Sequence, residues 1–328
     1  MPKRLISYSA CLLLPISIGC TTSPSTTARG RQFLVAFSQC NNAEPYRAAQ
    51  NALMTKLWAQ HPDVKFVIGD AQQDDNKQIA QIETFIRQKP DLLIVAPNER
   101  APLTGVMGNA MHAGIPVICL ERDIMEPNYT TFVGADNRQI GGLAGQFVVD
   151  YLQKKFGEPR GNVVQIKGLL GVAGEIDRND GAQKILSKYP GIKIVSDPVA
   201  DWIQAKAKDR MTEALRANPH IDVVYAHNDP MAVGAYLAAK ELGREREMIF
   251  VGVDGLGGPS GGIKKVQDGI LAATFVYPLC VEKAVEIGNR MLHESQFRPD
   301  KTYVLPSTMI TPANADQEYK QNTFEQAQ

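Results

Sequence analysis

The feature that most constrains the fold of this chain is a regular alternation between short apolar runs and longer segments with helical periodicity. The apolar runs are rich in Val, Ile and Phe, as in strands that are buried on both faces of a parallel sheet. Such alternation predicts an α/β fold with doubly wound parallel sheets. We expect strands at 33–38, 64–70, 92–97, 116–121, 131–135, 163–167, 192–196, 223–226, 249–253 and 271–277.

The segments between these runs have the periodicity of helices, and Gly114 and Gly243 stand where two of them should stop. Ten strands are many for one sheet of ordinary size, so two sheets are expected. The chain divides near Asp136 and Asn137, with about five strands on each side. The expected helices are 45–60, 76–88, 103–113, 140–155, 177–188, 205–217, 231–242, 263–268 and 282–293.

Length and charge narrow the class of protein. A chain of 328 residues suggests two domains. Lys and Arg together number 35, as do Asp and Glu, so the net charge is +0. This balance does not favour a nucleic-acid partner.

The first thirty residues have the pattern of an export signal. Lys3 and Arg4 precede a mostly apolar stretch over 5–19, which is shorter than the roughly 20 residues that a membrane-spanning helix needs. Gly19-Cys20 resembles a bacterial lipoprotein cleavage site, so we expect residues 1–20 to be a signal peptide and Cys20 to be lipidated. The alternative is ordinary cleavage that releases a free protein. Residues 21–30, rich in Ser, Thr, Pro and Gly, are expected to form a tether.

Enzyme and metal signatures give little support to a catalytic role. The sequence contains no GxSxG, HExxH or GxxxxGK[ST] motif. The Gly-rich run 255–262 follows a strand but lacks the Lys-Ser/Thr of a phosphate-binding loop. A flexible turn into a helix is expected, and an anion-binding turn is the alternative. The five His residues have no metal-ligand spacing. We therefore expect a protein that is not an enzyme and that needs no metal or cofactor.

The mature chain contains an odd number of Cys residues. Cys40, Cys119 and Cys280 remain after the leader, so at least one thiol is unpaired unless it bonds to another chain. Cys119 lies in an apolar run and is expected to be a small buried hydrophobic residue.

Polar residues gather where the predicted strands end, which is where ligands bind in open parallel sheets. Carboxylates at Glu121, Asp136 and Asp254 could be catalytic, but neutral polyols require the same groups, since a sugar hydroxyl both donates and accepts hydrogen bonds. Tyr46 and Trp202 could cover the apolar face of a sugar ring. Their alternatives are a helix-surface Tyr and a half-buried core Trp.

Arg178 follows a Gly-rich link, 168–174, that allows the backbone to approach a ligand closely. It could therefore reach a ligand in the cleft. A helix-surface Arg is the alternative.

Five segments in order carry a resemblance to a known family: 37–47, 114–122, 133–137, 225–229 and 251–255. Over about residues 31–315 the chain resembles the periplasmic sugar-binding proteins of the type I, ribose-binding-like fold, a fold that the ligand domain of LacI-type repressors shares. The start Phe37-Ser38-Gln39 and the segments 176–178 and 225–229 are most similar to the galactofuranose-binding branch. No helix-turn-helix precedes the first strand, and the export signal occupies that place, so a repressor is not expected.

The resemblance implies a set of ligand-binding residues and two departures from the family pattern. Glu121 stands where the family usually has Asp, and Tyr277 stands where ribose binders have Gln, which weakens any assignment of ribose. The implied ligand-binding residues are Ser38, Asn42, Glu44, Tyr46, Arg47, Glu121, Arg122, Asp136, Asn137, Arg178, Trp202, Asn228, Asp254 and Tyr277.

The resemblance also implies the domain organisation and the function. The N-terminal lobe is expected over 31–135 and 278–305, and the C-terminal lobe over 136–277 and 306–328. Three hinge crossings would lie near 135–136, 277–278 and 305–306.

The lobes are expected to close on a monosaccharide-like ligand in the periplasm, and the protein, a monomer, to deliver it to an ABC permease. The alternative is presentation of a bound sugar or autoinducer to a membrane histidine kinase. The sequence does not separate these two roles.

Overall fold

The structure is a computed structural model that describes Met1 and residues 31–322. Residues 2–20 of the expected signal peptide, with the Cys20 lipidation site, and the whole of the expected tether, 21–30, lie outside these residues. Within them, no helix has the length and apolar character needed to cross a membrane.

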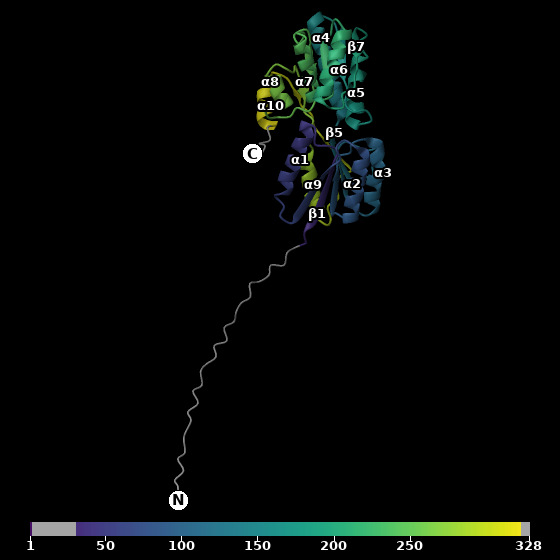
Figure 1. The fold of residues 1–328 in the computed structure, drawn as a ribbon, viewed down its shortest axis with the longest axis vertical. Helices are drawn as coiled ribbons and strands as arrows, with labels where there is room; N and C mark the ends of the chain where they lie inside the picture. Colours follow the sequence, from purple (N-terminus) through teal and green to yellow (C-terminus); the bar gives the residue numbers. More distant parts are fainter. Residues whose placement is uncertain (2–30, 323–328) are drawn as a thin grey trace. The chain divides into compact units, whose positions relative to one another are not determined.

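The first sheet is parallel and contains six strands in the order β11-β5-β4-β3-β1-β2. Helices cover both of its faces (Figure 1). One cluster of buried side chains packs α1 and α9 against one face, and another packs α2 and α3 against the other. These elements are β1 (Phe33–Gln39), α1 (Pro45–Trp58), β2 (Val64–Asp70), α2 (Asp75–Gln88), β3 (Leu92–Val95), α3 (Arg100–His112), β4 (Val117–Glu121), β5 (Thr131–Ala135), α9 (Val281–His293) and β11 (Thr302–Leu305).

The second sheet is parallel with the order β7-β6-β8-β9, and β10 and β12 form a separate antiparallel pair. Neighbouring residues face opposite ways: Val163 packs in the cluster with α4 and α5, and Val164 in the cluster with α6 and α7. These elements are α4 (Asn137–Phe156), β6 (Gly161–Ile166), α5 (Ala173–Leu186), β7 (Ile192–Ser196), α6 (Gln204–Ala217), β8 (Val223–Ala226), α7 (Asp229–Glu241), β9 (Ile249–Val251), α8 (Gly262–Gln267), β10 (Thr274–Phe275), β12 (Met309–Ile310) and α10 (Ala315–Asn322).

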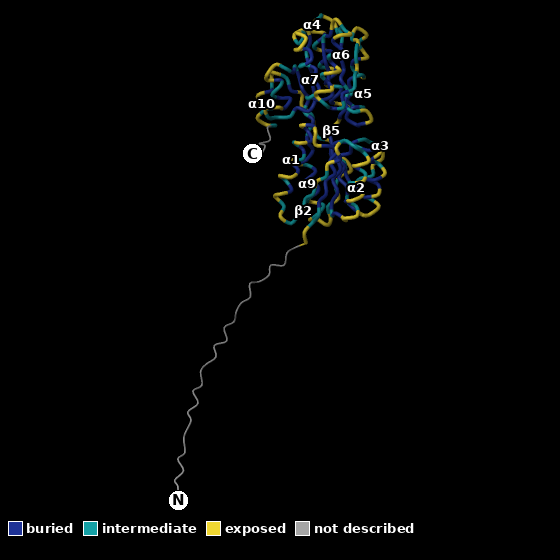
Figure 2. The backbone as a smooth tube through the Cα atoms, in the orientation of Figure 1, coloured by how far each residue is buried: buried dark blue, intermediate teal, exposed yellow. Residues whose placement is uncertain are grey.

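We call the first sheet with α1, α2, α3 and α9 the N-terminal lobe, and the second sheet with the β10–β12 pair and the remaining helices the C-terminal lobe. The predicted α/β class with parallel sheets is confirmed, and the strands form the buried interior of both lobes (Figure 2). The chain crosses between the lobes after β5, after β10 and after β11. That the lobes move as separate domains stays a prediction.

Four elements differ from the expectation. The expected strand over 271–277 is reduced to Thr274–Phe275, because Ala273 and Val276 make only isolated bridges to Val251 and Asp254. The strands β11 and β12 were missed because they contain only four and two residues. The last helix, α10, was also missed, since only Ala315 of its residues is buried.

Turns fall where glycine predicts them. Gly114 and Gly243 follow α3 and α7 with φ of 76° and 69°, a region that favours glycine. The Gly-rich run leads into α8, as expected of a turn. Cys40, Cys119 and Cys280 are buried free thiols.

Close packing of α4 on α5 positions one residue of the site. A Cβ at Gly181 of α5 would lie 2.1 Å from the carbonyl oxygen of Arg138 on α4, so only glycine fits. One turn earlier on α5, Arg178 is buried. Contact between these two helices therefore fixes the position of Arg178.

We expect Gly181→Ala to separate α4 from α5 and to lower the free energy of unfolding by about 1–3 kcal/mol, the usual cost of overpacking. Gly105→Ala is the control, because its added Cβ meets nothing within 4 Å in helix α3. The control should raise stability by roughly 0.5–1 kcal/mol. Urea unfolding of both variants measures the difference. Equal stability of Gly181→Ala and the wild type would contradict the packing argument.

Candidate functional site

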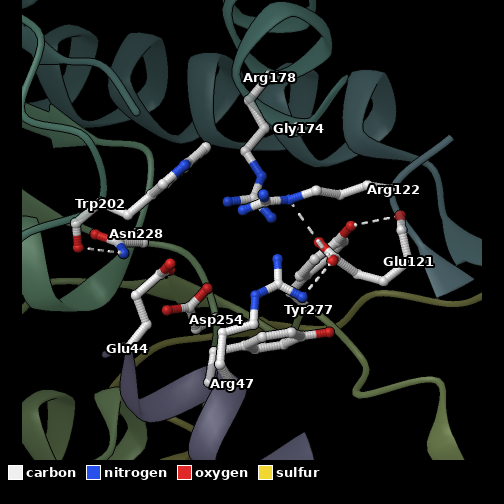
Figure 3. Close-up of a pocket in the computed structure, with 11 residues that line it drawn as sticks. Glu44, Arg47, Glu121, Arg122, Gly174, Arg178, Trp202, Asn228, Asp254 and Tyr277 are labelled. Atoms are coloured by element: carbon white, nitrogen blue, oxygen red, sulfur yellow. Dashed lines mark hydrogen bonds and ion pairs between the residues drawn. The ribbon is translucent and has the colours of Figure 1, made fainter. Parts of the chain in front are cut away.

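A pocket lies between the two lobes. Its walls come from α1, from the ends of β4 and β8, from α5 and from the loops after β7 and β9 (Figure 3). Charged and aromatic side chains dominate the lining. The lining residues are Glu44, Tyr46, Arg47, Glu121, Arg122, Gly174, Arg178, Trp202, Asn228, Asp254 and Tyr277.

The N-terminal lobe supplies a buried ion pair. Nη1 of Arg47 lies 2.6 Å from Oε2 of Glu121, and the side chains are 2% and 3% exposed. Gln50, one turn along α1, accepts a second hydrogen bond from Nη1 of Arg47 and donates one to the carbonyl oxygen of Leu279. Nε of Arg47 has no hydrogen-bond partner among the described residues, so a donor is left at the pocket wall.

Two more arginines are held by backbone carbonyls. Arg122 donates to the carbonyl oxygen of Asn98 at 3.2 Å. Arg178 donates to the carbonyl oxygen of His227 and, through Nε, to Oδ1 of Asn137 at 2.9 Å. Because these partners fix the guanidinium groups in advance, binding would cost little conformational entropy.

Aromatic rings pack against these cations. Tyr277 stacks on Tyr46 with 5.3 Å between ring centroids, and the Arg178 guanidinium lies 4.4 Å from the Tyr277 centroid. The guanidinium groups of Arg122 and Arg178 both lie 5.7 Å from the centre of the Trp202 ring. Trp202 itself rests on Gly168, where a Cβ would be 2.2 Å from the indole. The pocket thus combines flat apolar surfaces with fixed hydrogen-bond donors.

Three lining residues have backbone conformations that side chains disfavour. Glu121, Trp202 and Asp254 have φ values of 67°, 70° and 133°. Such strain persists only where surrounding contacts enforce it, and it is concentrated at ligand sites. The three residues end or follow β4, β7 and β9, so each turn aims a side chain into the space between the lobes.

Asp254 has the acidic side chain with the fewest hydrogen bonds in the pocket. Its residue is 6% exposed, and no hydrogen bond to its carboxylate occurs among the described residues. Burial, together with the neighbouring Asp229, raises the pKa of Asp254 well above its ordinary value. The same burial raises the pKa of Asp229 to about 7, although Thr274 and the backbone N–H of Gly255 donate to its carboxylate. The buried surroundings of Asp254 therefore favour its protonated form more than those of an ordinary aspartate do.

Ten of the residues implied by the resemblance line the pocket: Glu44, Tyr46, Arg47, Glu121, Arg122, Arg178, Trp202, Asn228, Asp254 and Tyr277. Tyr46 is 4% exposed, so it is not a helix-surface Tyr. Trp202 is also 4% exposed, and both residues line the pocket while belonging to clusters of buried hydrophobic side chains. Arg178 is likewise buried rather than on a helix surface.

The other four predicted residues lie outside the lining, and their hydrogen bonds explain why. Ser38 is buried beneath the site and donates to Gln81, while Asn42 is exposed and donates to Asp70. Asp136 caps α4 by accepting from the N–H of Gln139. Asn137 accepts a hydrogen bond from Arg178 and donates one to the hydroxyl of Tyr277, so it supports two lining residues.

Sequence reasoning missed the supporting residues. Helical spacing could have identified Gln50, since it lies three residues after Arg47 on the same face of α1 and accepts a hydrogen bond from it. Asn98 and His227 act through backbone carbonyls, for which side-chain identity gives no signal. His227 is fully buried, and burial lowers its pKa well below the ordinary value, so it is neutral.

The lobes also contact each other at Arg100 of α3. Its guanidinium makes two hydrogen bonds to Asp123 in its own lobe, at 2.6 and 3.0 Å, and one to Asp177 of α5, at 3.1 Å. Arg138 holds the other oxygen of Asp177. This network bridges the lobes outside the pocket lining.

The Arg47–Glu121 pair predicts a pH-dependent contribution to stability. Burial alone would raise the pKa of Glu121, but the charges of Arg47 and Arg122 outweigh it and lower the pKa. A lowered pKa gives stability that is complete above the unfolded value of about 4.3 and is lost as the pH falls through the folded value. At pH 7, Glu121→Gln should cost about 3–5 kcal/mol, because Arg47 is left buried and unpaired.

Urea unfolding at pH 7 and pH 3 tests this. The difference between wild type and Glu121→Gln should shrink at the lower pH. The control is Glu158→Gln, whose exposed pair with Arg160 should contribute under about 1 kcal/mol. A difference that does not change with pH would argue against the ion pair.

Comparisons with known proteins agree with this geometry. The family model for the periplasmic binding protein domain matches residues 35–282. The galactofuranose-binding protein YtfQ of Escherichia coli (strain K12) is 31% identical over 78% of this chain and 79% of that protein. The xylitol-binding protein of Mycolicibacterium smegmatis is 30% identical over 79% of this chain and 72% of that protein.

Among solved structures, the fructose-binding periplasmic domain of a hybrid two-component system superposes with a TM-score of 0.83 and 35% identity, covering 88% of this chain and 94% of that one. A galactofuranose-binding protein superposes with a TM-score of 0.81 and 28% identity, covering 88% and 98%. The chain therefore belongs to the periplasmic binding protein domain family, and its fold is that of the type I sugar-binding members.

Proposed function

We propose that this protein captures a free, monosaccharide-like sugar between its lobes outside the cytoplasm and delivers it to an ABC importer, without chemical change to the sugar. The observation that carries this proposal is the composition of the pocket. Its lining contains three arginines held by hydrogen bonds, three carboxyl residues and three aromatic rings. Hydroxyl groups need paired donors and acceptors, and the C–H face of a sugar needs an apolar ring. The relatives named above bind galactofuranose, xylitol and fructose.

Closure of the lobes supplies the mechanism. Ligand would dock on one lobe, and hinge rotation would bring the other lobe onto it. Arg47, Arg122, Arg178, Asn228 and Asp254 would then meet the hydroxyl groups. Each charge-assisted hydrogen bond is worth about 1.5–3 kcal/mol, and micromolar affinity needs about 8 kcal/mol in total after the entropic costs. The free donor on Nε of Arg47 is a contact that a hydroxyl could complete.

The rest of the proposal concerns location and partners. We propose that residues 1–20 are removed on export, that lipidation of Cys20 holds the monomeric protein at a membrane, and that the closed lobes present a surface to the permease. A second function is favoured by one comparison: the fructose-binding neighbour belongs to a two-component system. Under that alternative the liganded protein would activate a sensor kinase.

A thermal-shift screen of residues 21–328 against pentoses, hexoses, furanose sugars, polyols and amino acids tests the function. A ligand that binds only the folded state raises the melting temperature. We expect a rise with sugars or polyols. A rise with amino acids alone would overturn the sugar assignment, and no rise with any compound would contradict the whole proposal.

Substitutions test the assigned residues. Arg178→Ala or Asp254→Ala should weaken binding of the sugar found in the screen at least tenfold by calorimetric titration, since each removes a contact worth more than about 1.4 kcal/mol. The control is Arg216→Ala, on the exposed side of α6, which should bind like the wild type. Wild-type affinity in either pocket variant, with the fold intact by circular dichroism, would refute its assignment.

A further inference from the structure

A second hollow adjoins the pocket and shares Asp254 with it. This groove has a volume of about 270 Å³ and lies between the start of α1 and the starts of α6 and α7. Exposed Gln204 and Ser260 at its rim leave it open to solvent. A chemical group in the groove could therefore project outward while the lobes stay closed around the pocket.

The groove and the pocket meet at Asp254. This residue lines both, and Glu44 of the pocket is followed directly by Pro45 of the groove. Asp254 and Glu44 lie beside each other at one end of the pocket (Figure 3). A ligand that occupies the pocket can thus continue past Asp254.

The carboxyl groups of Asp229 and Asp254, which both line the groove, differ in their hydrogen bonds. Both oxygens of Asp229 accept hydrogen bonds, one from Thr274 at 2.6 Å and the other from the N–H of Gly255 at 2.9 Å. Gly252 and Gly262 leave room for it, since a Cβ on either would lie 2.2 or 1.7 Å from its oxygens. The carboxyl of Asp254, by contrast, lacks a hydrogen-bond partner among the described residues and borders both hollows.

The position of Asp254, on the wall shared by the pocket and the groove, suits it to one kind of oxygen. Burial and the nearby Asp229 raise its pKa well above the ordinary value, which favours the form of the carboxyl that donates a hydrogen bond. A glycosidic oxygen has no proton and can only accept one. A bridging oxygen between two sugar units is therefore a fitting partner at this point.

The chemistry of the groove suits a second polyhydroxylated unit. Its walls mix apolar with polar side chains, namely Pro230, Val233, Leu256, Gln204, Ser260 and Lys265. Apolar surface with a few placed polar groups is the usual composition of small-molecule sites. The groove lacks an aromatic platform, so its contacts would be weaker than those of the pocket.

We infer that the groove beside Asp254 is a second subsite, and that the preferred ligand is a sugar ring bearing a glycosidically linked substituent that extends into it. This inference rests on the proposed function. It narrows the substrate class from a free monosaccharide to a glycoside or disaccharide whose first ring lies between Trp202 and Tyr277.

Calorimetric titration of the full mature chain tests the inference with matched pairs: D-fructose against sucrose, D-galactose against lactose, and L-arabinose and D-ribose against their methyl glycosides. At least one extended sugar should bind tenfold or more tightly than its parent. Val233→Trp, which fills the groove, should weaken the extended sugar at least tenfold and leave the parent within twofold. Leu242→Trp, beyond the far end of α7 at an exposed position, should change neither.

The outcomes separate the two claims. Parent sugars that bind more tightly than every extended form would overturn the second subsite and leave the sugar-binding function standing. So would equal loss of both ligands in Val233→Trp, with Ser260→Trp repeating the test from the other wall. Failure of all the sugars to bind would overturn the function itself, and the subsite with it.

Discussion

The site depends on the phenol of Tyr277, which links both lobes at a crossing between them. Its hydroxyl donates to the backbone oxygen of Glu121 in the N-terminal lobe at 3.0 Å and accepts from Asn137 of the C-terminal lobe at 3.2 Å. Its ring stacks on Tyr46 and supports the Arg178 guanidinium. The side chain of Tyr277 therefore holds the backbone of Glu121 in one lobe and the guanidinium of Arg178 in the other. A glutamine, as in ribose binders, could make the hydrogen bonds but not the ring contacts.

The buried arginines of the pocket lose their hydration, and contacts within the protein offset this loss before a ligand binds. Arg47 is paired with Glu121, and Arg122 and Arg178 are held by backbone carbonyls. Strained turns at Glu121, Trp202 and Asp254 aim the remaining side chains, and glycines at 168 and 181 allow the close approaches that hold Trp202 and α5 in place. A preorganised pocket of this kind is built for recognition, since little conformational entropy is left to lose on binding.

The sequence predicted the parts of this arrangement that repeat along the chain. Continuous apolar runs located the parallel strands, and polar residues at their ends located most of the pocket, because parallel strands point their carboxyl ends to one edge. The resemblance added Tyr277. It did not separate ligand contacts from supports: Asn137 and Asp136 adjoin each other, yet one holds Arg178 and the other caps α4. Carbonyl partners such as those of Asn98 and His227 depend on tertiary geometry, as do the edge strands β11 and β12.

The most direct test of the account uses the two tryptophans, Trp58 and Trp202. Trp202 lines the pocket, whereas Trp58 is buried in the core against Phe66. Titration with the bound sugar should give a saturable change in intrinsic fluorescence in the wild type and in Trp58→Phe, and none in Trp202→Phe. A change that survives in Trp202→Phe and disappears in Trp58→Phe would place the ligand elsewhere and contradict the account.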